Sequence, residues 1–262
     1  MSFSKRYFVS TSIIVFLVCF SLFVKLGLNA DPATQNLDNA FSTPSFIEPL
    51  GTDQYGRSNA ARLADAISNS LLIAVSSVVI AVSVALVSGV YAGWFGGWFD
   101  RICSVLVNMV MALPGLVLVL LFGALIPGSF SFLLLGIALT MWAELFRVIR
   151  SRTQKLCKSP EFENSRLLGF GRIYRFRMHL WPYLKADVFT LACFGAGNAI
   201  LALASLGFLY VGLRPPQAEL GMMMVELFRY YQVAPWVLVQ PVITLMLLIF
   251  SFYSLAKGRE LK

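Results

Sequence analysis

Few residues of this 262-residue chain have side chains suited to covalent or metal chemistry. His179 is the only histidine, so we expect no histidine-based metal site within one chain. The sequence has no G-x-x-x-x-G-K-[ST] phosphate loop, no G-x-S-x-G nucleophile elbow and no H-E-x-x-H zinc motif. We therefore expect no catalytic residue, no bound metal and no cofactor in this chain. The cysteines lack metal-ligand or disulfide spacing, and we interpret them as small buried hydrophobes: Cys19, Cys103, Cys157 and Cys193.

Glu144 is the one carboxylate that lies clearly inside an apolar run. An acid at membrane depth is by default a functional candidate. Arg147 follows three residues later, near the expected cytoplasmic end of the run. A local ion pair, or side chains that reach toward the interface, would therefore explain Glu144 equally well. Both interpretations stay open. So little buried charge suggests that any transport draws its energy from elsewhere than an ion gradient coupled within this chain.

The polar groups concentrate in one strongly basic segment, 159–183. Ten of the 21 Lys and Arg residues lie between Arg147 and Lys185. A large basic loop in a hydrophobic protein usually faces the cytoplasm. Such a loop can dock a soluble partner, or it can hold anionic lipid headgroups. The net charge of +8 would also suit nucleic acid, but charge asymmetry across a membrane gives the same excess, so we expect no nucleic-acid partner.

The composition indicates an all-α membrane protein that positions these groups. The chain is 58% hydrophobic and 13% charged, whereas soluble domains have about 25% charged residues. The apolar runs reach the roughly 20 residues of a membrane-spanning helix and are too long for barrel strands. Pro114-Gly115 predicts a kink in the third run, and small residues predict a central place for the fifth. We predict six transmembrane helices, at about 7–28, 67–93, 104–126, 130–150, 186–212 and 236–256.

Charge counting predicts that both termini are cytoplasmic. In that topology the inner segments hold 16 of the 21 basic residues. The first run could be a cleaved signal peptide, but its apolar core exceeds the roughly 7–15 residues of such peptides. We favour an uncleaved signal anchor over residues 1–30, an extracytoplasmic loop over 31–66 and a transmembrane domain over 67–262. The outer loop is net acidic, which fits a cationic ligand or the charge complement of the basic inner side.

Within the basic segment, the residue order predicts two short helices joined at a glycine. The tripeptide 159–161, Ser-Pro-Glu, is a helix start, with a capping residue, a proline at the first position and then an acid. This helix should end near Gly169, which can adopt a turn conformation that other residues avoid. A second helix over about 171–180 should stop at Trp181-Pro182, just before the fifth span.

The spacing of this segment is specific. Five residues separate Glu163 from Gly169, and nine separate Gly169 from His179. The pattern resembles the EAA loop of binding-protein-dependent ABC importer permeases, although Asn164-Ser165 replaces Ala-Ala and Trp181 replaces the usual Leu. The resemblance implies an ATPase-coupling interface formed by Glu163, Asn164, Ser165, Gly169, Arg172, Arg175, His179 and Pro182.

Other segments resemble the dipeptide/oligopeptide/nickel branch of that family. L-G-T-D-Q-Y-G-R at 50–57 and A-L-P-G at 112–115 are similar to its signatures, as is A-S-L-G-F-L at 204–209. The similarity covers most of 50–255 and fits the C-type member of a permease pair. It implies one leading helix plus a five-helix permease core, with a cytoplasmic coupling-helix loop at 159–183.

The resemblance also implies partners and a location. They are a second homologous permease, two ATP-binding subunits, an extracytoplasmic solute-binding protein and the lipid of a bacterial inner membrane. ATP would be bound and hydrolysed by the partner subunits, whose closure would move a rigid elbow and the spans attached to it. This chain would be a non-catalytic membrane subunit.

The cargo is open at this stage. Leu203 and Ser58 stand where peptide-class members often carry Glu and Asp. We expect a di- or oligopeptide, with nickel or a metal–chelator complex as the alternative, and we interpret the methionines at 222–224 as packing residues. A secondary carrier would need buried ion-coupling residues or an inverted repeat, and neither is evident. A membrane scaffold would not be expected to keep both signature segments.

Overall fold

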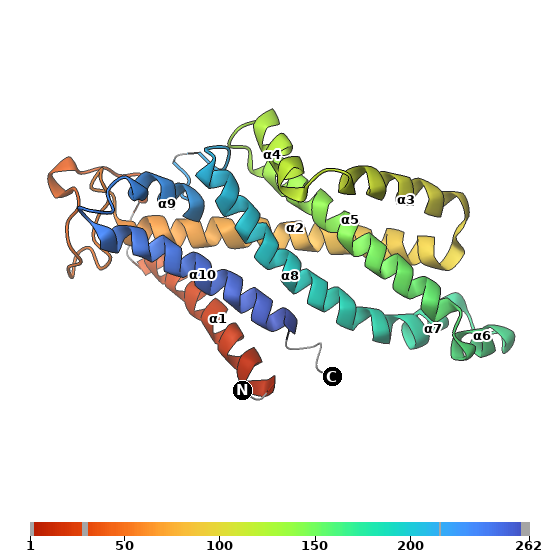
Figure 1. Ribbon diagram of the computed structural model, residues 1–262. Coiled ribbons are helices and arrows are strands. Elements are labelled where there is room, and N and C mark those ends of the chain that lie inside the picture. The colour runs from red at the N-terminus through yellow and green to blue at the C-terminus, as the bar shows by residue number, and fades with distance from the viewer. Residues whose placement is uncertain (1–2, 28–30, 215, 258–262) are drawn as a thin grey trace.

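The computed structural model describes residues 3–27, 31–214 and 216–257, and helices dominate this part of the chain (Figure 1). The described part contains no strand, only a single bridge between Thr52 and Ser58. The all-α prediction is therefore confirmed. The long helices are α1 (Phe3–Gly27), α2 (Asn59–Phe95), α3 (Gly97–Met111), α4 (Gly115–Leu125), α5 (Phe130–Cys157), α8 (Trp181–Phe208) and α10 (Pro235–Lys257). The short ones are η1 (Leu37–Asn39), α6 (Pro160–Leu167), α7 (Arg172–Arg175), η2 (Phe176–Leu180) and α9 (Leu220–Phe228).

Five helical segments are long and apolar enough to cross a membrane, and the pair α3–α4 makes a sixth if it counts as one span. This pair is bent by 86°, so the prediction of one span over 104–126 was too simple. The expected kink at Pro114 is a full break. The Pro114 carbonyl accepts hydrogen bonds from the N–H groups of Val117 and Leu118, which starts α4 in a new direction.

Helix α2 begins at Asn59, eight residues before the predicted span 67–93. Hydropathy missed this first part because it carries Arg62 and Asp65. The fold pairs both charges: Arg62 binds Asp53, and Asp65 binds Lys25. The loop predicted over 31–66 is therefore shorter in the structure, because it ends at Ser58, the residue that precedes α2.

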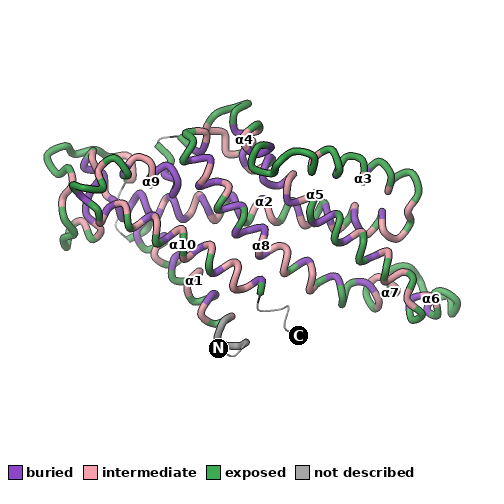
Figure 2. Tube along the Cα trace, viewed as in Figure 1, coloured by how far each residue is buried: buried purple, intermediate pink, exposed green. Residues whose placement is uncertain are grey.

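Helix α2 packs along α5, and small residues let the two backbones approach closely. A Cβ on Gly89 would lie 3.0 Å from Ile149 Cγ2, and one on Gly93 would lie 2.7 Å from the carbonyl oxygen of Arg150. The exposed residues of α3 lie on the outside of this pair, whereas buried residues follow α2 and α8 (Figure 2). The central place predicted for the fifth span agrees with this pattern.

Helix α1 belongs to the bundle and packs against α2 and α10. Ser21 Oγ donates a hydrogen bond of 2.7 Å to the carbonyl oxygen of Ala64. The first turns of α1 and the last turn of α10 lie on one side, away from the 31–58 loop (Figure 1). One side of α1 remains uncovered, so Cys19 is exposed, contrary to the prediction. Cys157, at the end of α5, is only half-buried, whereas Cys103 and Cys193 are buried as predicted.

Trp181-Pro182 does not stop the second helix of the basic segment, so that prediction was wrong. The helical path is continuous from Arg172 to Phe208. Pro182 is the second residue of α8, and its missing N–H removes one backbone hydrogen bond from the continuous helical path. The wider π-helical turn η2 precedes it, and the Trp181 N–H reaches back to the Phe176 carbonyl.

Candidate functional site: the 159–183 elbow and the outer ion network

The segment 159–183 forms an elbow at one end of the bundle, between α5 and α8 (Figure 1). Helix α6 begins as the sequence predicts. Ser159 Oγ accepts a hydrogen bond from the Phe162 N–H at 3.4 Å, and Pro160 occupies the first helical position. Glu163 lies 3.6 Å from Arg166 in an exposed i,i+3 pair, which contributes little to stability.

Gly169 closes the turn between the two short helices. Its φ of +78° lies in the left-handed region, and an added Cβ would meet no atom within 4 Å. The Gly169 N–H bonds the Arg166 carbonyl, and the Phe170 N–H reaches the Ser165 carbonyl, which together satisfy the end of α6. The turn therefore needs glycine for its backbone conformation and not for space.

The inner face of the elbow rests on the end of α2 through aromatic contacts. Phe162 is buried and meets Trp94 edge to face, with ring centroids 5.5 Å apart. The Arg175 guanidinium lies over both rings, at 5.6 Å from Trp94 and 5.4 Å from Phe162. Ser165 Oγ and His179 Nε2 are 2.6 Å apart, which ties α6 to η2. These contacts make the elbow a preformed unit of α6, α7 and η2.

The predicted interface residues divide into two groups. Ser165, Arg175 and His179 point into the elbow and hold it together. Asn164, Gly169, Arg172 and Pro182 are exposed, and Glu163 is half-exposed. Arg172 also lies over the Phe95 ring, at 5.5 Å.

Sequence reasoning overlooked the apolar tip of the elbow. Leu167 and Leu168 are each 75% exposed and Ile173 is 78% exposed. Contiguous exposed apolar patches are typical of surfaces that contact a protein or a membrane. The signal was available, because two leucines directly precede the turn glycine.

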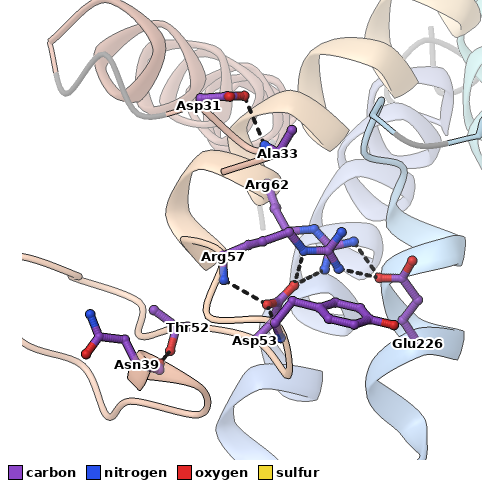
Figure 3. A network of polar contacts seen from close by, with 9 residues as sticks. Asp31, Ala33, Asn39, Thr52, Asp53, Arg57, Arg62 and Glu226 are labelled. Carbon is purple, nitrogen blue, oxygen red and sulfur yellow. Dashed lines mark hydrogen bonds and ion pairs between the residues drawn. The ribbon is translucent and has the colours of Figure 1, made fainter. Parts of the chain in front are cut away.

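A second polar site lies at the opposite end of the bundle, where the 31–58 loop meets α2 and α9 (Figure 3). Asp53 is fully buried and accepts bonds of 2.6 Å from Arg57 Nε and from Arg62 Nη1. Both arginines also bind Glu226 on α9, at 3.1 and 2.6 Å. We call Asp53, Arg57, Arg62 and Glu226 the outer ion network.

The sequence identified Gly51, Gly56 and Asp53 as turn formers, and the two glycines have φ of +72° and +67°. Asp53 has a second role that local patterns could not show. It neutralises two arginines that come from the loop and from α2, and Glu226 completes the balance from more than 160 residues away. Asp53, one of the acids that made the loop 31–66 net acidic, is thus already paired, which removes it as a ligand for a cationic cargo.

Two further features that the sequence singled out, the methionine run and Glu144, have distinct surroundings. Met222 and Met223 are buried, as packing residues are. Glu144 is exposed on α5, and the described part of the chain offers it no ion pair. The expected local pair with Arg147 is not formed.

Several helices long and apolar enough to cross a membrane, with an elbow at one end and a buried ion network at the other, define a multi-pass membrane protein. A family of binding-protein-dependent transport system inner membrane components matches residues 85–258. The chain belongs to this family, and it is a multi-pass inner membrane protein.

Curated relatives extend the similarity to nearly the whole chain. The dipeptide transport system permease protein of Escherichia coli is 32% identical over 251 residues, which cover 94% of this chain and 84% of the relative. The di/tripeptide transport system permease protein of Pseudomonas aeruginosa is 29% identical, with coverage of 87% and 77%. The metal-staphylopine import system permease protein of Staphylococcus aureus is 31% identical, with coverage of 98% and 91%.

Proposed function

We propose that this chain is one permease subunit of an ATP-driven, binding-protein-dependent importer and forms half of the translocation path for a di- or oligopeptide. Its permease partner is a second, homologous chain, and two separate subunits bind and hydrolyse ATP. The observation that carries the proposal is the elbow 159–183, a preformed unit with an exposed apolar tip that continues without a break into α8. The chain itself binds no cofactor in this proposal.

The proposal places the elbow and both termini in the cytoplasm and the outer ion network outside. The basic residues around the elbow support this orientation. The 31–58 loop then faces the solute-binding protein. Phe46 and Ile47 protrude from this loop fully exposed, which suits a protein contact better than contact with water.

Import of a metal–chelator complex is the second candidate. It is favoured by the 31% identity to a metal-staphylopine permease, which is close to the 32% identity to a dipeptide permease. Both cargo classes would use the same subunits and the same elbow. Uptake of radiolabelled dipeptide and of radiolabelled nickel, with and without chelator, by cells that express the whole system separates the two.

The coupling role is tested by Gly169→Pro and Glu163→Lys in the complete transporter. We expect both variants to insert and to co-purify with the second permease, while ATP hydrolysis no longer drives uptake. Pro at 169 cannot adopt the φ of +78° and lacks the N–H that bonds the Arg166 carbonyl. Glu161→Lys is the matched control on α6, because Glu161 is exposed and precedes the predicted contact residues. Normal coupled uptake by both test variants would refute the assignment of the elbow.

A further inference from the structure

A polar groove of about 1060 Å³ lies between α3, α5 and α8. Polar side chains enter it at helical spacing from all three helices. Helix α3 contributes Ser104 and Asn108, and α8 contributes Asp187 and Thr190. Helix α5 contributes Glu144, Arg147 and Ser151 from successive turns of one face. Apolar helices that face only lipid would not align polar groups in this way.

The charges in the groove are of two kinds. Toward the elbow end Arg150 pairs with Asp100 and Arg152 pairs with Asp187 at 2.7 Å, and Lys155 is exposed. Deeper in the groove, Glu144 and Arg147 take part in no ion pair within the described ranges. Arg147 contacts only the sulfur of Met111, at 3.1 Å. Over residues 144–147 of α5, the groove thus keeps one negative and one positive group available, while Lys155 lies about two turns further toward the elbow.

An unpaired acid and an unpaired base at membrane depth suit a ligand that carries one positive and one negative charge. Leaving both charges unpaired in hydrocarbon would be costly, so this face borders a water-filled path or another polar surface. Side chains at i and i+3 on a helix have Cβ atoms about 5–6 Å apart. The termini of an extended dipeptide are separated by at most about 7 Å. A small zwitterion therefore matches the groove in charge, order and size.

We propose that this groove binds the cargo as a zwitterion, with Glu144 receiving the ammonium group and Arg147 the carboxylate. The inference rests on the proposed importer function and specifies its substrate class: short peptides with free termini, or chelators that carry both amino and carboxylate groups. Asn108, on α3, is exposed in the same groove and can report on its occupancy. The site lies on the path near its inner end and is separate from any selection made by a solute-binding protein.

The test uses inside-out membrane vesicles that contain the complete transporter, without nucleotide. Asn108→Cys is treated with a thiol reagent, and modification of residue 108 is followed by peptide mass spectrometry, which separates it from the native cysteines. The probes are Ala-Ala, N-acetyl-Ala-Ala, Ala-Ala-amide and the doubly capped peptide. Ser83→Cys is the control, because Ser83 lines an apolar groove elsewhere, with Tyr91 and Phe99.

We expect Ala-Ala to protect residue 108, the doubly capped peptide not to protect it, and neither to affect residue 83. Glu144→Gln should remove the preference for a free amine, and Arg147→Gln the preference for a free carboxylate. Each change should raise the half-protecting Ala-Ala concentration about tenfold, as expected for a lost charge-assisted hydrogen bond. This pattern is one that a general packing defect would not produce.

Equal protection by all four peptides, or no protection by any, overturns the inference. The inference is also overturned if the thiol reagent modifies residue 108 only after the second permease is removed. In that case Glu144 and Arg147 would contact the second permease and not the cargo. Failure of this inference can be told apart from failure of the proposed function. A chain that lacks ATPase partners would refute the importer and leave the protection data valid, whereas coupled import without protection would refute only the zwitterion site.

Discussion

Replacement of Asp53 by Asn is the sharpest test of the outer ion network. Asp53 is fully buried and accepts side-chain bonds from Arg57 and Arg62, as well as bonds of 2.9 Å from the N–H groups of Tyr55 and Arg57. Asparagine keeps the shape and can still accept a bond, but it removes the charge. Two nearly buried guanidinium groups would then share Glu226 as their one acid within the network (Figure 3).

The expected loss of stability is large. Removal of one partner from a buried ion pair typically costs 3–5 kcal/mol, because the other charge stays buried without compensation. Glu226 remains and is partly exposed, so we expect the lower end of this range, about 3 kcal/mol. Thermal unfolding of the detergent-solubilised transporter measures the global effect. Limited proteolysis from outside measures the local one, and we expect faster cleavage within the 31–58 loop.

Asp31→Asn is the matched control from the same loop. Asp31 is exposed and binds only its neighbours, the Ala33 N–H and the Thr34 hydroxyl, both at 3.0 Å. We expect it to change stability by less than about 0.5 kcal/mol. In the double variant Asp53→Asn/Arg62→Gln, removal of one unpaired cation should make the loss smaller than the sum of the single losses. Additive losses, or an Asp53→Asn protein as stable as Asp31→Asn, would refute the description of Asp53 as a charge hub.

Three smaller predictions concern the two ends of α8. Burial raises the pKa of Glu219, the N-cap of α9, to about 7 from its ordinary 4.5, although bonds from two backbone N–H groups oppose the shift. Its contribution to the free energy of unfolding, about 3 kcal/mol, is thus full below pH about 4.5 and is lost as the pH rises through 7. Thermal unfolding between pH 4.5 and 8 measures this loss, and Glu219→Gln should make stability less dependent on pH over that range. Gly221→Ala places a Cβ 2.1 Å from the Ala204 carbonyl oxygen and should destabilise the protein by about 1–3 kcal/mol in thermal unfolding. The control is Gly115→Ala, which should be neutral because the nearest atom to its added Cβ is 3.9 Å away. Ser165→Ala breaks the 2.6 Å contact with His179 and should speed amide hydrogen exchange in α6 without affecting α10.

The sequence predicted the parts of the fold that depend on neighbouring residues. The start of α6 at Ser159-Pro160 and its end at Gly169 follow from capping chemistry, and the structure has both. Apolar runs located the long helices because a span needs about 20 such residues. Local patterns sufficed wherever the cause of the structure lies within one or two helical turns.

The failures share one physical reason, which is that tertiary partners change the meaning of a residue. Arg62 and Asp65 looked like loop residues until Asp53 and Lys25 paired them inside a helix. Pro182 looked like a helix stop, but a preceding π-helical turn let the helix continue. Arg175 looked like a surface cation, and it lies over Trp94 and Phe162. None of these outcomes is encoded in spacing along the chain.

The long continuous helix offers a physical link between the two polar ends. From Arg172 to Phe208 the path has 37 residues, about 55 Å at 1.5 Å per residue. At its outer end α8 packs tightly against the start of α9: a Cβ on Gly207 would lie 1.9 Å from the Glu219 carboxylate. Helix α9 in turn carries Glu226 into the outer ion network. Under the proposed coupling, a displacement of the elbow would therefore reach the outer loop through packed helices. Gly207→Ala, whose Cβ would push α9 away from α8, should weaken uptake without weakening the binding of the ATPases.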